Sequence, residues 1–313
     1  MTHLDEFAND VHFYLQQDPK QLPSRYLYDA LGSALFEAIC HLPWYPITRA
    51  EHRLLRRFGN SLLGRLDASN IIELGCGNGD KLAALLDTRP SAACPLDIHL
   101  VDLSSSALAV ARGRLEPLEH LSVVTHVATY EAGFAQAVDD TASGQRLVLF
   151  LGSNIGNFDP PASAAFLRGM RSRLRAGDAF LLGADLVKPV DVMELAYDDP
   201  LGVTAAFNLN LLVRANRELG ANFSLDQFAH RGVWNEASSR MEMHLVARFD
   251  QHVVVPAAKL AIKISTGESL WTESSYKYRV GDLSDLLTEA GFGIVDQFVD
   301  EQDPFALTLA RAV

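Results

Sequence analysis

The sequence predicts an α/β fold: a doubly wound, mostly parallel seven-stranded sheet whose last strand is antiparallel. Three observations lead to this prediction. Short β-like runs alternate with helical stretches from residue 69 onward, a glycine-rich loop follows the first of these runs, and the chain closes on two adjacent β-like runs. Alternating strands and helices form βαβ units, whose strands are parallel and whose helices cover both faces of the sheet.

The elements of this sheet follow from apolar runs and helical periodicity. The expected strands are 70–74, 97–103, 122–128, 146–152, 179–186, 292–300 and 304–313. The expected helices are 80–87, 105–115, 161–177 and 280–291. In the last of these helices, Val280, Leu283 and Leu287 recur at helical spacing and form one apolar face.

The last two expected strands, 292–300 and 304–313, are separated by only a few residues. A parallel crossover needs roughly a dozen residues or more, so this pair must be an antiparallel hairpin. A parallel sheet that closes in this way differs from the usual all-parallel dinucleotide fold. It is what the Rossmann-like class I S-adenosylmethionine methyltransferases have.

Two segments lie outside the expected sheet. Residues 190–279 contain a helical stretch and several runs rich in β-forming residues, and this length is far beyond a loop. We therefore expect an inserted α+β substrate-binding domain at 190–279 and an N-terminal helical cap at 1–60 that contributes to the substrate site. The remaining 61–189 and 280–313 form the predicted S-adenosylmethionine-binding domain.

Composition limits the partners of the chain. Its 313 residues carry a formal net charge of −12 and no run of Lys or Arg, so we expect no nucleic-acid and no membrane partner. The start of the chain lacks the apolar core of a signal peptide. Cys40, Cys76 and Cys94 form neither a CxxC motif nor a disulfide framework, which favours a reducing cytoplasm. We further expect a monomer.

The histidines do not show the close spacing of a metal-binding motif. There is no HExxH among the ten histidines. His99 and His126 fall inside expected strands, where we interpret them as hydrogen-bonded core or surface residues. The sequence therefore predicts no metal site.

The loop IIELGCGNGDK at 71–81 is the sharpest ligand-binding signal. A triphosphate site is disfavoured because Leu82 replaces the hydroxyl residue that follows the lysine of a P-loop. The glycine spacing is GxGxG and not the GxGxxG of dinucleotide enzymes, and Glu73 would bring negative charge near a phosphate. A cationic sulfonium ligand is favoured by the same carboxylate. Asp102 ends the second expected strand, where a carboxylate accepts hydrogen bonds from ribose hydroxyls.

Several long segments of the chain resemble the histidine N-alpha-methyltransferase family of the ergothioneine pathway. The resemblance covers nearly the whole sequence. Its longest motifs are RYLYDALGSALFEAICHLPWYPITRAE (25–51), ELGCGNGDK (73–81), LFLGSNIGNF (149–158), AYDDPLGVTAAFNLN (196–210) and TESSYKY (272–278). It implies that the chain is an enzyme that converts L-histidine into its trimethylated betaine, hercynine, with S-adenosylmethionine as the methyl donor.

The resemblance also implies roles for individual residues. Asn157 and Tyr197 are expected to hold the substrate carboxylate, and Tyr45 is expected to lie beside the amine as the catalytic residue. Tyr28, Glu273 and Ser275 are expected to bind the imidazole, and Met243 to line its pocket. The expected cofactor-binding residues are Glu73, Gly75, Gly77, Lys81, Asp102, Thr129 and Tyr130.

The sequence departs from the family pattern at two places. Family members often carry an acid followed by an aromatic residue after the third strand, whereas this chain has Thr129 and Tyr130. Tyr45 is followed by Pro46 where relatives have a second tyrosine. The first departure concerns the adenine contact, and the second concerns the shape of the turn at Tyr45.

Other functions stay open at this point. The chain is interpreted alternatively as an N-methyltransferase for another amino acid, such as a tryptophan derivative, or as a non-catalytic binding protein that retains the cofactor fold. A nicotinamide oxidoreductase is disfavoured by the glycine spacing and the terminal hairpin. Glu273 with Ser275 favours an imidazole substrate, because one side chain accepts a hydrogen bond and the other serves the second ring nitrogen.

Overall fold

The computed structural model describes residues 3–89, 95–118, 120–141 and 143–313. The chain divides into two compact units, each built from two separate stretches of sequence. The first unit comprises Met1–Tyr45 and Pro189–Ser275, and the second comprises Pro46–Lys188 and Tyr276–Val313. Residues 46–60, which the sequence analysis assigned to the N-terminal cap, thus lie in the second unit.

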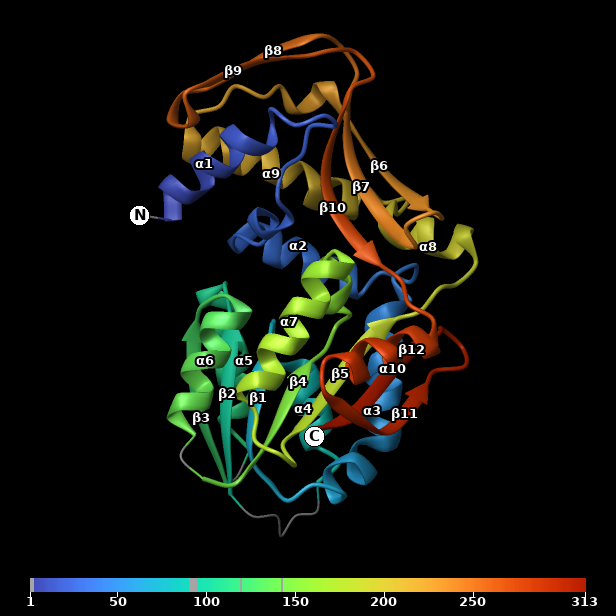
Figure 1. The fold of residues 1–313 in the computed structure, drawn as a ribbon. Helices are drawn as coiled ribbons and strands as arrows, with labels where there is room; N and C mark the ends of the chain where they lie inside the picture. The colour runs from blue at the N-terminus through green and yellow to red at the C-terminus, as the bar shows by residue number, and fades with distance from the viewer. Residues whose placement is uncertain (1–2, 90–94, 119, 142) are drawn as a thin grey trace. The chain divides into compact units, whose positions relative to one another are not determined.

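A seven-stranded sheet forms the centre of the second unit (Figure 1). Its strands are β1 (Ala68–Leu74), β2 (Leu96–Asp102), β3 (Leu121–Val127), β4 (Gln145–Phe150), β5 (Ala179–Asp185), β11 (Phe292–Val299) and β12 (Phe305–Ala312). Their spatial order is β11-β12-β5-β4-β1-β2-β3. Strands β1 to β5 pair in parallel, whereas β12 is antiparallel to both β5 and β11. The predicted class I methyltransferase fold with an antiparallel last strand is confirmed.

Helices cover both faces of this sheet. On one face, α3 (Pro46–Gly64) packs against α4 (Asp80–Leu86), which packs against α5 (Ser105–Leu115). On the other, α6 (Tyr130–Asp140) packs against α7 (Pro160–Arg173), which contacts α10 (Val280–Glu289). The short 3₁₀ helix η2 (Asn154–Asn157) follows β4. All seven residues of β5 are buried, as a central strand covered on both faces requires.

The first unit joins the N-terminal segment to the insert. Its elements are α1 (His3–Tyr14), η1 (Ser24–Leu27), α2 (Ala30–Cys40), α8 (Val190–Tyr197), α9 (Val203–Leu219), η3 (Leu225–Gln227), β6 (Phe228–Asn235), β7 (Arg240–Ala247), β8 (Gln251–Val255), η4 (Pro256–Ala258), β9 (Leu260–Ile264) and β10 (Ser269–Tyr276). Helix α9 contacts α1, α2 and the strands β6 and β7. The backbone of Trp271 in β10 accepts a hydrogen bond from Leu22 N and donates one to Lys20 O, both at 2.9 Å.

The strands of the first unit form two small sheets. Three of them pair in the order β10-β7-β6, and β8 and β9 form a separate hairpin. The β-rich sequence at 251–264 thus forms two strands and not one. Pro256, which has no backbone N–H, begins the short helix η4 between the two strands, and Lys259 adopts a positive φ of 48°.

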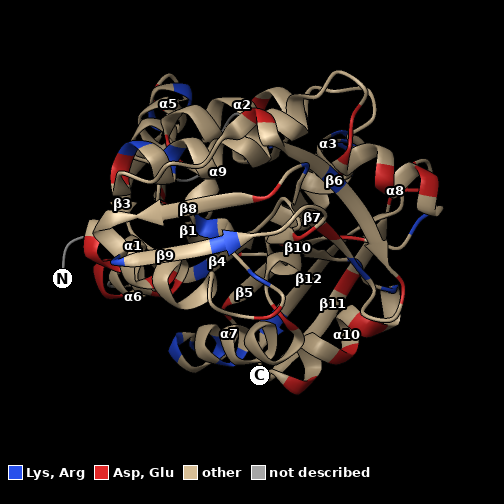
Figure 2. Cartoon of the chain, turned by 90° about the horizontal axis from the view of Figure 1, so that it is seen from above, with Lys and Arg blue, Asp and Glu red and all other residues tan. Residues whose placement is uncertain are grey.

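Charge is dispersed over the elements of both units. Figure 2 shows Lys and Arg distributed over many helices and strands, with acidic residues along α8 and α10. Among the residues that the structure describes, no helix is long and apolar enough to cross a membrane. Cys40 is half-buried and Cys76 is buried, both as thiols, while Cys94 lies outside the described residues.

Candidate functional site

The glycine loop between β1 and α4 depends on backbone conformations that suit glycine. Gly75, Gly77 and Gly79 have φ values of 71°, 52° and 74°, in the left-handed region that other L-residues rarely adopt. A Cβ on Gly75 would lie 2.7 Å from Asn154 Nδ2, and one on Gly79 would lie 2.9 Å from the Cβ of Ala111. A Cβ on Gly77 would meet no described atom within 4 Å. Close packing thus excludes side chains at the first and third glycines, whereas the second faces open space.

Asp102, the last residue of β2, is tied to this loop. Its Oδ2 accepts a hydrogen bond from Gly77 N at 3.0 Å, and its Oδ1 accepts one from Ser104 N at 2.9 Å. Burial raises the pKa of the Asp102 carboxyl above its usual value, while these backbone donors act in the opposite direction. Each carboxylate oxygen keeps a further lone pair, so the group can still accept hydrogen bonds from a ligand.

Glu73 places a buried carboxyl group directly before the loop. The residue is 1% exposed, and no donor among the described residues lies within hydrogen-bonding distance of its Oε2. Burial raises the pKa of Glu73 to about 8; Lys81 lowers it, whereas Asp80, Glu51 and Asp102 raise it further. A buried carboxyl oxygen without a donor suits a cationic ligand, because a positive charge supplies the interaction that the protein leaves unmade.

Lys81 reaches a different carboxylate. Its Nζ lies 2.9 Å from Oε2 of Glu51, a fully buried residue of α3. Both oxygens of Glu51 in turn accept from the backbone N–H of Gly152, at 2.9 and 3.0 Å. The Lys81–Glu51 pair therefore connects the helix after the glycine loop to the segment that follows β4.

Sequence reasoning did not identify Glu51, although a signal for it exists. Glu51 lies four residues after Ile47 and four residues before Leu55, and both of these apolar residues are buried. An acid within the apolar stripe of an amphipathic helix must be paired when buried. That placement distinguishes Glu51 from the exposed charges of α3.

Thr129 and Tyr130 lie at the start of α6. The Thr129 side chain caps the helix by accepting from Ala132 N. The Tyr130 ring packs edge-on against Phe150, with centroids 5.2 Å apart, and would lie 3.1 Å from a Cβ on Gly75. Tyr130 thus borders the glycine loop, and its ring belongs to an aromatic cluster with Phe150, Phe158 and Phe166.

Asn157 ends η2, the short helix after β4. Its side chain is exposed. This position follows the carboxyl end of a parallel strand, which is the edge where ligands bind in doubly wound sheets. The residue belongs to the second unit, as do all seven residues expected to bind the cofactor.

The other six expected substrate residues belong to the first unit, and two of them are hydrogen-bonded to each other. The hydroxyl of Tyr197, the last residue of α8, donates to Ser275 Oγ in β10 at 2.8 Å. The Tyr45 ring lies 6.2 Å from that of Tyr197 at an interplanar angle of 64°. All three residues are at least nine-tenths buried. The fold therefore brings together side chains that are far apart in the sequence.

Tyr28 joins this group through aromatic contacts. Its ring packs edge-on against Phe36 and Phe207, with centroid distances of 5.6 and 5.5 Å. Phe36 also lies 6.3 Å from Tyr45. Phe36 and Phe207, which the sequence did not predict as parts of the site, thus connect two of the expected substrate residues.

Met243 and Glu273 occupy neighbouring strands of the β10-β7-β6 sheet. Met243 is 2% exposed, and its carbonyl accepts a hydrogen bond from Thr272 Oγ1. Glu273 is half-buried, whereas Ser275 is buried. Along β10, buried and partly exposed residues alternate as far as Thr272 but not beyond it. The burial pattern alone therefore does not place Glu273 and Ser275 on one face of the strand.

The chain is similar over nearly its full length to enzymes of one family. A family model described as histidine-specific methyltransferase, SAM-dependent, matches residues 7–312. The histidine N-alpha-methyltransferase of Mycolicibacterium smegmatis is 39% identical over 98% of this chain and 95% of that protein. The protein of the same name from Mycobacterium tuberculosis is 38% identical over 99% of this chain and 98% of its own length.

A third relative is a longer protein. Ergothioneine biosynthesis protein 1 of Schizosaccharomyces pombe is 30% identical over 89% of this chain, and the match covers 37% of that protein. The family match, the glycine loop followed by Asp102, and the sheet with its antiparallel β12 agree with one another. The chain belongs to the family of S-adenosylmethionine-dependent, histidine-specific methyltransferases.

Proposed function

We propose that this methyltransferase transfers methyl groups from S-adenosylmethionine to the α-amino group of L-histidine, up to the trimethylated betaine hercynine, as in ergothioneine biosynthesis. The observation that carries the proposal is the gathering of Tyr45, Tyr197 and Ser275 within one unit. These residues come from the N-terminal segment, the start of the insert and its end. The full-length similarity to histidine N-alpha-methyltransferases supports the same assignment.

We propose that the cofactor is held by the loop of Gly75 and Gly77 and by the carboxyls of Glu73 and Asp102. S-adenosylmethionine supplies a methyl group on a positively charged sulfur, together with an ammonium group and ribose hydroxyls. The unpaired oxygen of Glu73 suits the positive charge, and the free lone pairs of Asp102 suit the hydroxyls.

The remaining proposed cofactor residues act at the borders of this site. Tyr130, which packs beside Gly75, offers an aromatic face for the adenine, and Thr129 precedes it at the helix cap. Lys81 acts on the site through its pairing with Glu51 and through the positive charge that it brings near Glu73. Loss of Lys81 would leave the Glu51 carboxylate buried and without its cation.

We assign the substrate residues by the chemistry of the amino acid. Asn157 donates a hydrogen bond to the carboxylate, and so does Tyr197, whose hydroxyl proton turns from Ser275 Oγ to the substrate. Tyr45 orients the amine. Tyr28, Glu273 and Ser275 bind the imidazole, which offers one donor and one acceptor, and Met243 lines the same pocket. A pocket of this kind rejects apolar side chains, because its own polar groups would be left without partners.

The protein's contribution to the reaction is mainly positional. Methyl transfer requires an amine that has lost its proton and whose lone pair points along the carbon–sulfur axis, and it needs no covalent enzyme intermediate. Alignment of the two reactants and exclusion of water supply most of the rate enhancement. The Tyr45 hydroxyl accepts a hydrogen bond from the amine and remains compatible with the added methyl groups. We further propose that the enzyme acts as a monomer in the cytoplasm.

The test is a product-mass assay. The purified protein is incubated with S-adenosylmethionine and a panel of amino acids that includes histidine, tryptophan, tyrosine and phenylalanine. We expect histidine to gain the mass of one, two and three CH2 groups, because each methyl group replaces one hydrogen of the amine, and we expect the other amino acids to remain unmodified. Turnover of another amino acid without turnover of histidine would refute the proposed substrate, and cofactor binding without any turnover would favour a binding protein.

A pair of variants makes the same assay specific for the imidazole pocket. Glu273→Ala should raise the KM for histidine by at least about ten-fold, the cost of one lost charge-assisted hydrogen bond, and leave the affinity for S-adenosylmethionine unchanged. Glu236→Ala is the matched control, because Glu236 is an exposed acid of the same unit. Equal losses of histidine and cofactor affinity in Glu273→Ala would show that Glu273 does not bind the imidazole.

A further inference from the structure

Two buried histidines face each other in the second unit, within the adjacent strands β2 and β3. His99 pairs in register with Val124, and Val101 pairs with His126, so the two histidines are diagonal neighbours on one face of the sheet. His99 Nδ1 lies 3.0 Å from His126 Nε2. The rings are nearly parallel, at 17°, and the residues are only 4% and 7% exposed.

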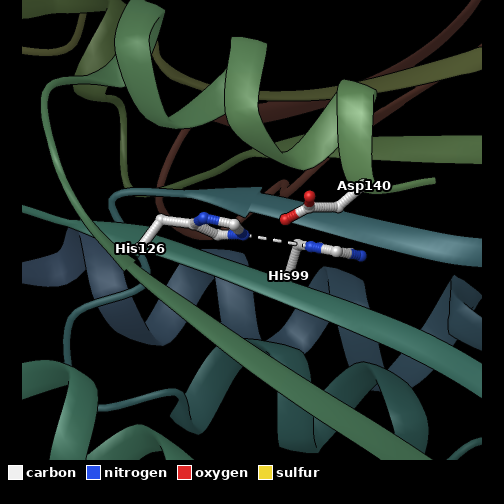
Figure 3. A group of neighbouring side chains, drawn as sticks. All are labelled: His99, His126 and Asp140. Atoms are coloured by element: carbon white, nitrogen blue, oxygen red, sulfur yellow. Dashed lines mark hydrogen bonds between the residues drawn. The ribbon is translucent and has the colours of Figure 1, made fainter.

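A carboxylate completes this group. Asp140 is the last residue of α6, the helix that packs on β2 and β3. Each of His99, His126 and Asp140 offers one atom that could bind a metal ion, and these three atoms lie within 4.8 Å of one another. Figure 3 shows the Asp140 carboxyl directed toward the two rings from the end of the helix.

A second acidic residue lies close to the group along the chain. Asp97 precedes His99 by two residues in β2, on the same face of the strand, and is exposed. Arg146 contacts the end of α6, where it donates to the carbonyls of Val138 and Thr141. Its ion pair, however, is with Asp178, and none of the ion pairs among the described residues includes Asp140.

The distance between the histidine nitrogens fits a shared metal ion. Zinc binds histidine nitrogen at about 2.0 to 2.1 Å, so two nitrogens on one ion lie about 2.9 Å apart at a right angle and about 3.3 Å apart at the tetrahedral angle. The observed 3.0 Å falls between these limits. Two imidazoles with one carboxylate suit zinc and similar transition-metal ions, whereas magnesium and calcium prefer oxygen donors only.

We propose that His99, His126 and Asp140 bind one divalent transition-metal ion, with zinc as the best match. The ligand atoms are His99 Nδ1, His126 Nε2 and a carboxylate oxygen of Asp140, and water fills the remaining position because Asp140 is exposed. Each imidazole binds as a neutral ring, so the proton of the present histidine–histidine hydrogen bond moves to the ring nitrogen that faces away from the ion.

The role of this ion is structural. It links the last residue of α6 to β2 and to β3, and β3 is the edge strand of the sheet. Histidine spacing in the sequence does not reveal the site, because its three ligands come from three different elements. This proposal departs from the expectation, drawn from the sequence, that the chain has no metal site.

Zinc titration of the tag-free, chelator-treated protein tests the proposal, in buffer without histidine or S-adenosylmethionine, which themselves bind metals. Metal content after dialysis should be close to one zinc per chain. His126→Gln should weaken zinc binding by roughly 100-fold, and Asp140→Asn by roughly ten-fold. Asp139→Asn and His252→Gln are the matched controls, because both residues are exposed and lie outside the group, and they should bind zinc as the unchanged protein does.

Thermal unfolding gives an independent readout. Zinc at about 100 µM should raise the Tm of the unchanged protein and of Asp139→Asn, and it should leave the Tm of His126→Gln unmoved, because only a ligand that binds the folded state stabilises it. Should His126→Gln fail to fold, the exposed Asp140→Asn carries the comparison. Zinc binding that is the same in Asp140→Asn and Asp139→Asn, or no binding at this concentration, overturns the proposal.

Discussion

At the scale of single residues, burial changes the ionisation of Glu73 in a way that bears on cofactor binding. Its carboxyl is buried, and burial raises its pKa to about 8, so the group is protonated at neutral pH. A cationic ligand stabilises the ionised form. Binding of S-adenosylmethionine should therefore release a proton from Glu73 and hold the cofactor by a charge that the free enzyme does not carry.

The first prediction concerns this proton. Between pH 6 and about 8 the affinity for S-adenosylmethionine should rise with pH, because ligand binding favours the ionised carboxyl. Calorimetry in buffers with different ionisation enthalpies should detect proton release that is absent in Glu73→Gln. Comparison of the two proteins cancels the cofactor's own titration. Equal proton release in both would exclude Glu73 as the source.

The same pKa has a consequence for folding. The folded value lies above the ordinary value of 4.5, so the folded state binds the proton more tightly than the unfolded state. The contribution of Glu73 to stability is thus complete below about pH 4.5 and is lost as pH rises through about 8. Glu73→Gln should flatten this part of the stability profile of the cofactor-free enzyme, as measured by urea unfolding at a series of pH values.

Residue types at element boundaries were the most predictable part of the site. Gly75, Gly77 and Asp102 follow strands whose apolar runs are visible in the sequence, and the structure places them together. Glu51 and the His99–His126 pair were not recognised as parts of sites, because each depends on a neighbour from another element. Local periodicity carries no information about such contacts.

At the scale of elements, strands were more readily predicted than helices. The seven strands of the large sheet were expected with bounds that differ by a few residues, because their apolar runs are dense. Helices α3 and α6 were not anticipated. Helix α3 contains four arginines, and its buried residues, such as Ile47, Leu54 and Leu55, are interspersed with these charges. Its apolar stripe becomes evident only at helical spacing.

The second prediction concerns the junction of β1 and α4. Gly79→Ala should destabilise the protein by about 1 to 3 kcal/mol, because alanine is strained at φ 74° and its Cβ would meet that of Ala111 at 2.9 Å. Gly113→Ala is the control in the helix that Gly79 packs against. Its added Cβ would meet no described atom within 4 Å, so it should stabilise by about 0.5 to 1 kcal/mol. Urea unfolding measures both values, and a neutral Gly79→Ala would contradict the role of this contact.

At the scale of the whole molecule, the proposed binding residues follow the division into two units. The cofactor residues all belong to the second unit, whereas six of the seven substrate residues belong to the first. The sequence indicated both groups through their motifs. It did not reveal that the first unit combines residues 1–45 with the insert, because that depends on contacts such as those between Lys20, Leu22 and Trp271.

The third prediction uses hydrogen exchange to separate the two ligands. S-adenosylhomocysteine alone should slow exchange in the loop at 75–79 of the second unit, because bound ligand suppresses local opening. Addition of histidine should then slow exchange at the end of α8 and in β10 of the first unit. Protection by histidine that is confined to the second unit would contradict the assignment of Tyr197 and Ser275.

The position of β12 has a consequence for biosynthesis. This strand follows every other strand of its sheet in the sequence, yet it lies between β5 and β11. Until it has been translated, the backbone donors and acceptors on the open side of β5 have no partner, although all of that strand's residues are buried in the finished protein. Late in translation the nascent chain therefore has an unpaired strand edge that can pair with another chain. Removal of β12 would leave the enzyme permanently in that aggregation-prone state.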